Sequence, residues 1–114
     1  STFGGNPLAT AAGVAVFEDI EEDHLLENAQ KMSAYFMNQL SGIQKKHPEI
    51  VDLRNAGLLI GIELTPETAK PTYLKLFEKH YLVSLCGNTL RLAPPLIVSE
   101  KDIDGFIKAL DEVL

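Results

Sequence analysis

Cysteine and basic residues are both scarce in this chain of 114 residues. Cys86 is the single cysteine, so no disulfide can form within the chain, and we expect a reducing compartment such as the cytoplasm. Ten Lys and Arg residues stand against sixteen Asp and Glu residues, which leaves a formal net charge of −6. An acidic chain with no basic cluster larger than Lys45-Lys46 is not expected to bind nucleic acid or an anionic membrane.

Long apolar runs are also missing from the sequence. No stretch of about 18 or more apolar residues occurs, so no transmembrane helix is expected. The chain begins with Ser1 and shows no signal-peptide pattern, and we expect it to be cut from a longer protein. Its hydrophobic fraction of 46% and charged fraction of 23% are those of an ordinary globular domain with one core.

Residues 1–17 contain no charged residue and predict a first helix. Asn6 suits the capping position and Pro7 the first turn. The helix that follows is small and apolar on every face, which is typical of a helix that is buried all round. We expect its partner to lie outside this chain. An acidic break at Asp19–Asp23 is predicted to end it, with Asp23 capping the next helix.

Three further helices are predicted from apolar spacing and capping residues. The second is expected to end before Pro48 and carries an apolar stripe: Leu25, Ala29, Met32, Phe36, Leu40 and Ile43. The third is predicted at Pro71–His80, with Leu74 and Phe77 facing inward. Ser99 and Asp102 resemble a capping box at the start of the last helix. One face of that helix carries Ile103, Phe106, Ile107, Leu110 and Leu114.

Strands are predicted in two regions. Leu58–Leu64 is an apolar run typical of a buried strand, and Gly61 within it suggests the close approach of a backbone or ligand. Tyr81–Cys86 and Thr89–Leu92 are β-prone runs joined by Gly87-Asn88, a hairpin turn signal. The fold class predicted is α+β, with a mostly antiparallel sheet covered by helices on one face.

Arg91 is the first candidate for a functional residue. It lies in a strand otherwise made of apolar residues, where alternation places Leu90 and Leu92 on one face and Arg91 on the other. A guanidinium there requires an anion, and a carboxylate is its best bidentate match. The spacing alone leaves two interpretations open: a substrate carboxylate, or a structural pair with a carboxylate of this chain.

Other candidate residues carry weaker signals. The opening motif STFGGNP combines hydroxyls, glycines and a helix start, which suits an anion or phosphate, but it also suits a tight turn. Arg54 is predicted to pair with a carboxylate at the entry to the strand. Cys86 is expected to be a small packing residue. The histidines, His24, His47 and His80, share no ligand spacing, so no metal site is expected.

Three motifs together resemble the class-III pyridoxal-phosphate aminotransferases. They are STFGGNPLA, R-x-x-G-L-L-I-G-I-E-L and L-R-L-A-P-P-L, in that order, and they span essentially the whole chain. The nearest subgroup is that of acetylornithine and ornithine aminotransferases. The chain departs from the family pattern at Asn55, where a glycine is usual before the strand. Asparagine tolerates left-handed geometry, so we expect the bend to survive.

The resemblance implies a homodimer and the small C-terminal domain of a fold-type-I pyridoxal-phosphate transferase. Residues 1–22 would be the end of the large cofactor domain and a linking helix, and residues 23–114 the small domain. The family's threonine at the position of Thr2, with Ser1 beside it, would contact the cofactor phosphate across the dimer interface. Arg91 would receive the α-carboxylate of the substrate.

The implied reaction moves an amino group between an ω-amino acid such as N-acetylornithine or ornithine, as in arginine biosynthesis, and a 2-oxo acid. The family's Schiff-base lysine would lie upstream of Ser1, and none of the eight lysines here has its context. We therefore assign no catalytic residue and expect the isolated chain to be inactive, without bound pyridoxal phosphate. Two alternatives are a non-catalytic amino-acid-binding module and a dimerisation domain.

Overall fold

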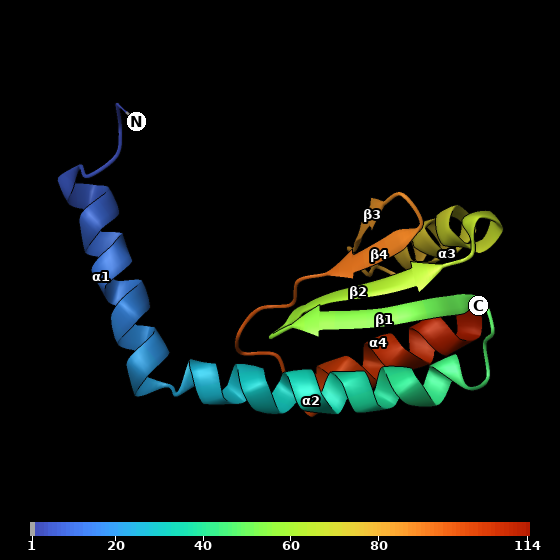
Figure 1. Cartoon of the computed structure of the whole chain (residues 1–114). Helices are drawn as coiled ribbons and strands as arrows, with labels where there is room; N and C mark the ends of the chain where they lie inside the picture. Colours follow the sequence, from blue (N-terminus) through green and yellow to red (C-terminus); the bar gives the residue numbers. More distant parts are fainter. Residues whose placement is uncertain (1) are drawn as a thin grey trace.

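A computed structural model describes residues 2–114 as a sheet with helices packed on it and one helix projecting away (Figure 1). The elements follow in the order α1 (Pro7–Glu22), α2 (Leu25–Gln44), β1 (Ile50–Ala56), β2 (Leu59–Leu64), α3 (Pro66–Glu78), β3 (Ser84–Cys86), β4 (Thr89–Leu92) and α4 (Glu100–Val113). No helix in this part of the chain is long and apolar enough to cross a membrane.

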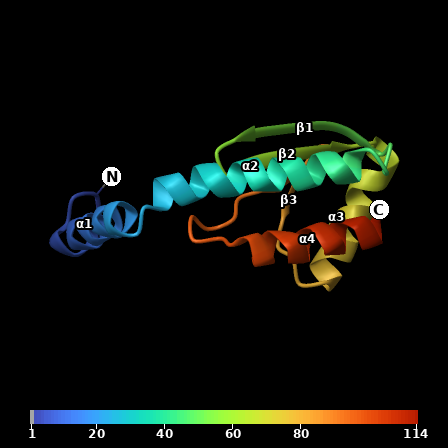
Figure 2. The same ribbon diagram turned by 90° about the horizontal axis from the view of Figure 1, so that it is seen from below.

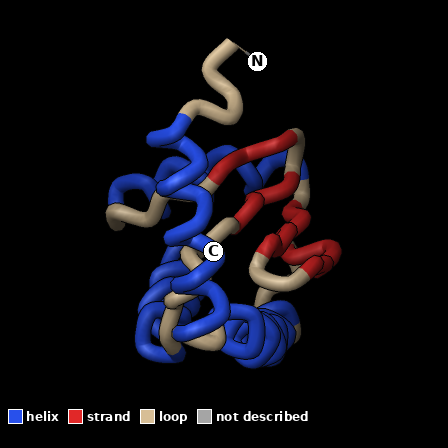
Figure 3. Tube along the Cα trace, turned by 90° about the vertical axis from the view of Figure 1, so that its left-hand side faces the viewer, coloured by secondary structure: helices blue, strands red, loops and turns tan. Residues whose placement is uncertain are grey.

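The strands lie side by side in one sheet (Figure 3). Their order is β1-β2-β4-β3, and all neighbours are antiparallel (Figure 1). Two hairpins, β1-β2 and β3-β4, therefore meet along β2 and β4, and α3 connects them. The Gly87-Asn88 hairpin turn is confirmed, with Gly87 at a φ of +59°. The predicted α+β class is also confirmed, because α2 and α4 lie together on one side of the sheet (Figure 2).

A single apolar core fills the space between the sheet and α2, α3 and α4. Alternate residues of the two central strands point into it: Ile60, Ile62, Leu64, Leu90 and Leu92. The stripe predicted for the second helix also enters the core, where Met32, Phe36, Leu40 and Ile43 are buried. Phe106 of α4 makes edge-on contacts with Phe36 and Tyr81, at ring-centroid distances of 5.6 and 5.5 Å. The core therefore fixes the positions of the strands, and with them the side chains that point away from the helices.

Helix α1 starts as predicted but ends later. The Asn6 side chain accepts a hydrogen bond of 3.0 Å from the Ala9 N–H, and Pro7 is the first helical residue. The predicted acidic break is wrong, because the helix continues to Glu22. Glutamate favours helix, and no residue there removes a backbone donor. Asp23 ends α1 instead of capping α2, whose N-cap is His24 at a φ of +50°.

Strand β1 was not predicted, and β3 is shorter than the predicted Tyr81–Cys86 run. Only Ile50 of β1 is buried, because charged residues such as Asp52 and Arg54 point outward from this edge strand. The apolar-run criterion detects continuous apolar segments and therefore overlooks β1, in which Asp52, Arg54 and Asn55 interrupt the apolar residues. Asn55 lies within this strand rather than in a left-handed bend, and the turn to β2 uses Gly57 at a φ of +58°.

The third helix begins at Pro66, five residues earlier than predicted, and so Pro71 lies inside it. Its inward side chains are Ala69, Thr72 and Leu76. The prediction that Leu74 and Phe77 face inward is wrong, since they are 48% and 56% exposed. The capping box of the last helix is confirmed: Ser99 accepts from the Asp102 N–H, and Asp102 accepts from the Ser99 N–H.

Candidate functional site

The outer face of the sheet, which points away from α2 and α4, carries its polar side chains in two rows. Antiparallel register aligns Arg54, Gly61, Arg91 and Ser84 in one row, from β1 to β3. The neighbouring row consists of Asp52, Glu63, Thr89 and Cys86. Side chains directly across from one another on the same face are close neighbours, so each row forms a contiguous line across the sheet.

Arg91 points to this outer face, as its alternation with buried Leu90 and Leu92 predicts. Across residues 2–114, no carboxylate lies within ion-pair distance of its guanidinium, and no hydrogen bond to its side chain is found. Of the two interpretations of Arg91 left open by the sequence, the structural pair is therefore absent. The guanidinium remains available to an anion from outside the described chain.

Arg91 borders an open groove of about 490 Å³ on the outer face. The groove is lined by Arg54, Asn55, Ala56, Leu59, Ile60, Gly61, Cys86, Thr89 and Arg91. The Arg91 guanidinium and the Thr89 hydroxyl supply hydrogen-bond donors, while Leu59 and Ala56 supply apolar wall. Such a surface suits a small carboxylate that carries an aliphatic chain.

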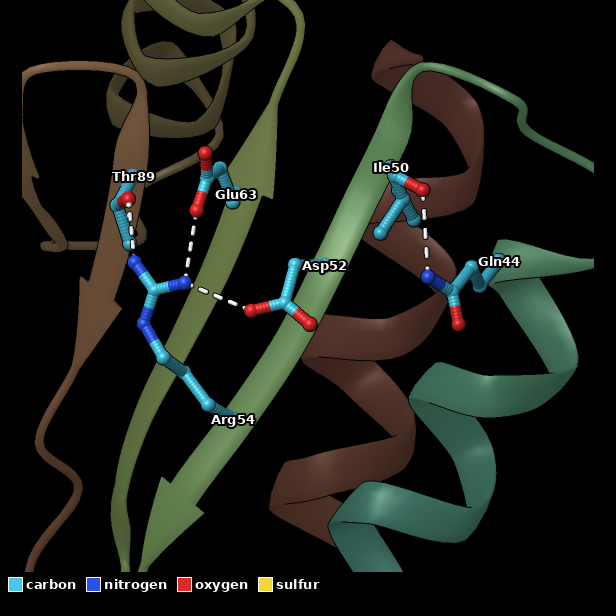
Figure 4. Close-up of polar contacts among 6 residues, drawn as sticks. All are labelled: Gln44, Ile50, Asp52, Arg54, Glu63 and Thr89. Carbon is cyan, nitrogen blue, oxygen red and sulfur yellow. Dashed lines mark hydrogen bonds and ion pairs between the residues drawn. The ribbon is translucent and has the colours of Figure 1, made fainter.

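Arg54 lines the same groove from β1, two strands away from Arg91, and its guanidinium is bound to three side chains (Figure 4). Its Nη1 donates to Asp52 Oδ2 and to Glu63 Oε2, both at 2.7 Å, and its Nη2 donates to Thr89 Oγ1 at 3.1 Å. The hydrogen bonds to Glu63 and then to Asp52 raise the pKa of Arg54 above its usual value. The predicted carboxylate pairing of Arg54 is confirmed, with two partners instead of one.

Gly61 makes room for this arrangement. A Cβ atom added to Gly61 would lie 3.3 Å from Arg54 Cγ and 3.3 Å from Thr89 Cγ2. Two side chains of the chain itself therefore come close to Gly61, where the sequence predicted a backbone or a ligand. A residue with a side chain would crowd Arg54 on its way to Thr89, two strands away.

Behind the groove, Asn55 joins the β1-β2 turn to α2. Its side-chain amide donates to Ser33 Oγ at 2.8 Å, and Ser33 Oγ in turn donates to the Gly57 carbonyl at 2.5 Å. Ser33 is 5% exposed, so these bonds replace water for a buried hydroxyl. Asn55 thus fastens the turn next to Arg54 through its side chain. Sequence reasoning missed this role, since Ser33 and Asn55 meet only in the folded chain.

The opening motif lies far from this groove. Thr2 is exposed in the turn before α1, and the N-terminal end of α1 points away from the sheet (Figure 1). Ser1, the other predicted contact to the cofactor phosphate, lies outside the described residues. The structure therefore does not bring Thr2 and Arg91 together.

Of the remaining candidates, only Cys86 borders the Arg91 groove. Cys86 is exposed at the end of β3, so the prediction of a packed residue is wrong. His47 Nε2 lies 2.8 Å from Asp111 Oδ1, while His24 occupies the N-cap position of α2 without a side-chain hydrogen bond to the helix. Within the described chain, no cluster of three or more metal-ligating side chains occurs. No lysine of residues 2–114 lies on a strand or lines the groove, so the groove holds no amine for a Schiff base.

Known proteins with similar sequences belong to one family. The sequence model of the family described as "Aminotransferase class-III" matches residues 1–114. The chain is 46% identical to an acetylornithine aminotransferase of Caldanaerobacter subterraneus and 44% identical to an ornithine aminotransferase of an Exiguobacterium species. All of this chain is covered in both comparisons, but only 29% and 28% of the respective relatives.

Solved structures that superpose on this chain are also aminotransferases. An acetylornithine aminotransferase from Elizabethkingia anophelis superposes with a TM-score of 0.92 at 34% identity, over 99% of this chain and 31% of that one. A lysine aminotransferase from M. tuberculosis superposes with a TM-score of 0.93 at 29% identity, over 100% of this chain and 27% of that one. The chain thus spans less than a third of the proteins that it matches.

Proposed function

Because this chain belongs to the class-III aminotransferase family, we propose that it is the C-terminal part of an enzyme that transfers an amino group from an ω-amino acid to a 2-oxo acid. N-acetylornithine and ornithine are the proposed amino donors, since relatives with these names match the whole chain. Residues 1–22 would link to a large cofactor domain, and residues 23–114 would form the small domain of a homodimer in the cytoplasm.

The observation that carries the proposal is the unpaired guanidinium of Arg91 in its groove. Two parallel N–H donors fix both the position and the orientation of a carboxylate. A substrate held in this way presents its amino-bearing carbon in one direction, which an amine-transfer reaction requires. We assign Arg91 to binding and orienting the α-carboxylate. The apolar wall of the groove would lie along the aliphatic part of the substrate.

Pyridoxal phosphate, the cofactor of this family, would supply the electron sink for the reaction. The residues described here fit only part of what the cofactor needs. The exposed Thr2 hydroxyl, with Ser1, would hold its phosphate, whereas no lysine borders the Arg91 groove. We therefore expect the chain by itself to be inactive. A non-catalytic amino-acid-binding module would also use Arg91, but the STFGGNP motif would have no purpose there.

The test is to replace Arg91 in the holoenzyme. Arg91→Lys keeps the charge but loses the fork, so the KM for an α-amino acid should rise while the fold is preserved. Arg91→Ala should reduce kcat/KM by roughly 2 to 5 kcal/mol, the range for truncating one partner of a desolvated charge pair. An amine of matching length without an α-carboxylate is the control substrate and should be affected far less. Equal losses for both substrates would place the carboxylate site elsewhere.

A further inference from the structure

A protein carboxylate lies within reach of Arg91 and yet does not bind it. Glu63 faces Thr89 across the β2-β4 pair, and Gly61 faces Arg91. Glu63 and Arg91 are therefore diagonal neighbours on the outer face. Diagonal neighbours in an antiparallel pair are roughly 7–8 Å apart, which long side chains can span. An ion pair between Glu63 and Arg91 is thus the obvious competitor of an incoming carboxylate.

Arg54 binds Glu63 instead. The Arg54 side chain crosses the space above Gly61 and reaches Glu63 Oε2 at 2.7 Å, while its other terminal nitrogen reaches Thr89 at 3.1 Å (Figure 4). The same guanidinium also binds Asp52, which faces Glu63 directly across the β1-β2 pair. Like charges directly opposite one another repel, and Arg54 offsets that repulsion. Arg54 therefore holds both carboxylates in ion pairs of its own.

We propose that Arg54 is a positioning residue that keeps the Glu63 carboxylate from pairing with Arg91, so that the Arg91 guanidinium stays open to the substrate carboxylate. The inference rests on the proposed function of Arg91. A carboxylate tethered on the neighbouring strand competes at a high effective concentration, of the order of millimolar or above. Without Arg54, Glu63 would occupy Arg91 in the free enzyme and would have to be displaced by each substrate molecule.

A purely structural role of Arg54 is the rival explanation, because the loss of three hydrogen bonds would also loosen the sheet. The two roles differ in what a second substitution does. If Arg54 only fastens the strands, then removing Glu63 as well removes one more partner and restores nothing. If Arg54 withholds Glu63 from Arg91, then removing Glu63 restores the affinity for a carboxylate.

The experiment measures the binding of pentanoate to the holoenzyme by titration calorimetry, with pentanamide as the uncharged ligand of the same shape. The variants are Arg54→Met, Glu63→Gln and the double variant. Arg54→Met should weaken pentanoate binding about tenfold and leave pentanamide unchanged, as competition by a neighbouring charge requires. The double variant should return to within about twofold of the wild type. In steady-state kinetics, Arg54→Met should raise KM and largely preserve kcat.

Three outcomes would overturn the inference: wild-type pentanoate affinity in Arg54→Met, a double variant as weak as Arg54→Met, or equal losses for pentanoate and pentanamide. Arg91→Met separates this test from that of the proposed function, because unchanged pentanoate binding in this variant would refute the carboxylate site itself. If Arg54→Met does not fold, Arg54→Lys replaces it. An ammonium cannot hold Asp52, Glu63 and Thr89 with one fork, so a smaller loss is expected, again reversed by Glu63→Gln.

Discussion

The side chain of Arg54 lies across Gly61, with its Cγ 3.3 Å from the point that a Cβ atom on Gly61 would occupy. The backbone of Gly61 has no positive φ, so what requires glycine there is space and not conformation. Because Gly61 of β2 has no side chain, the Arg54 side chain of β1 can pass over it and bind Thr89 of β4.

This relationship predicts the effect of Gly61→Ala. The added methyl group would press on Arg54 and Thr89, and the displaced Arg54 would lose part of its bonding to Glu63. We expect the free energy of unfolding to fall by about 1 kcal/mol, the lower end for inserting a methyl group into a packed site. Urea unfolding of the chain followed by circular dichroism measures this change.

Gly42→Ala is the matched control for that substitution. Gly42 lies within α2, and a Cβ atom there would meet nothing within 4 Å. Alanine should stabilise this helix by roughly 0.5–1 kcal/mol. In the Arg54→Ala background, the cost of Gly61→Ala should be smaller, because only the contact with Thr89 remains. An equal cost in both backgrounds would show that Arg54 is not what fills the space over Gly61.

Helix α1 leads to a second prediction, because most of its large apolar side chains are exposed. None of its residues is buried, and Leu8 and Phe17 are 82% and 71% exposed. Helix α1 packs against α2 alone among the described elements. Deleting residues 1–22 should therefore reduce self-association of the chain and leave the melting temperature of the rest nearly unchanged. Light scattering after gel filtration and thermal unfolding measure the two effects.

A double substitution, Leu8→Ser with Phe17→Ser, is the control for this deletion, since it keeps the helix and removes exposed apolar surface. It should reduce self-association in the same direction. If the shortened chain unfolds instead, α1 belongs to the core of this domain, and the boundary proposed at residue 22 is wrong.

Thr2→Val in the holoenzyme tests the proposed contact to the cofactor phosphate. Valine keeps the shape of threonine and removes the hydroxyl, so cofactor retention should weaken by roughly 1 to 3 kcal/mol, the range for leaving a buried partner unsatisfied. Equilibrium dialysis of the cofactor measures the change. Thr10→Val is the matched control, because the Thr10 hydroxyl donates within α1 to the Asn6 and Pro7 carbonyls. If both variants retain the cofactor equally well, Thr2 is not part of the site.

Local signals in the sequence predicted the elements whose causes are local. The Ser99–Asp102 capping box, the Asn6-Pro7 helix start and the Gly87-Asn88 turn each depend on residues a few positions apart, and all three are confirmed. The alternation around Arg91 also depends only on strand geometry. It correctly places the guanidinium on the outer face.

The contacts of Arg54 could not be predicted in the same way. Its partners lie on three strands, and one of those strands, β1, carries too little apolar character to be recognised. The register that brings Glu63 opposite Thr89 depends on which hairpins pair, and this is decided by the shared core. The neighbours of Arg91 therefore become known only from the folded structure, whereas the direction of its side chain follows from the sequence.

The final prediction concerns pH and the contact between His47 and Asp111. The imidazole Nε2 of His47 lies 2.8 Å from Asp111 Oδ1, and Lys46 Nζ lies 3.6 Å from Asp111 Oδ2. These contacts join the turn after α2 to the last part of α4. The hydrogen bond with His47, and then the charge of Lys46, lower the pKa of Asp111 below its usual value of 3.8.

A carboxyl group whose pKa is lowered by folding binds fewer protons in the folded state than in the unfolded state. Stability therefore rises with pH through the range between the two pKa values. The contribution of Asp111 is complete above about pH 4 and is lost as the pH falls through the lowered value. Asp111→Asn should accordingly lower the melting temperature at pH 7, and the difference from the wild type should shrink below about pH 4.

Glu100→Gln is the control for this substitution, because it breaks the exposed pair of Glu100 with Lys31, whose side chains are 49% and 71% exposed. Exposed pairs of this kind add little stability, so this variant should melt close to the wild type at both pH values. The charge removed is the same in both variants, and therefore a general effect of net charge would appear equally in each. The melting-temperature difference between Asp111→Asn and the wild type could instead stay constant from pH 7 to the acid limit of folding. In that case the His47–Asp111 contact does not depend on the charge of Asp111, and the prediction is wrong.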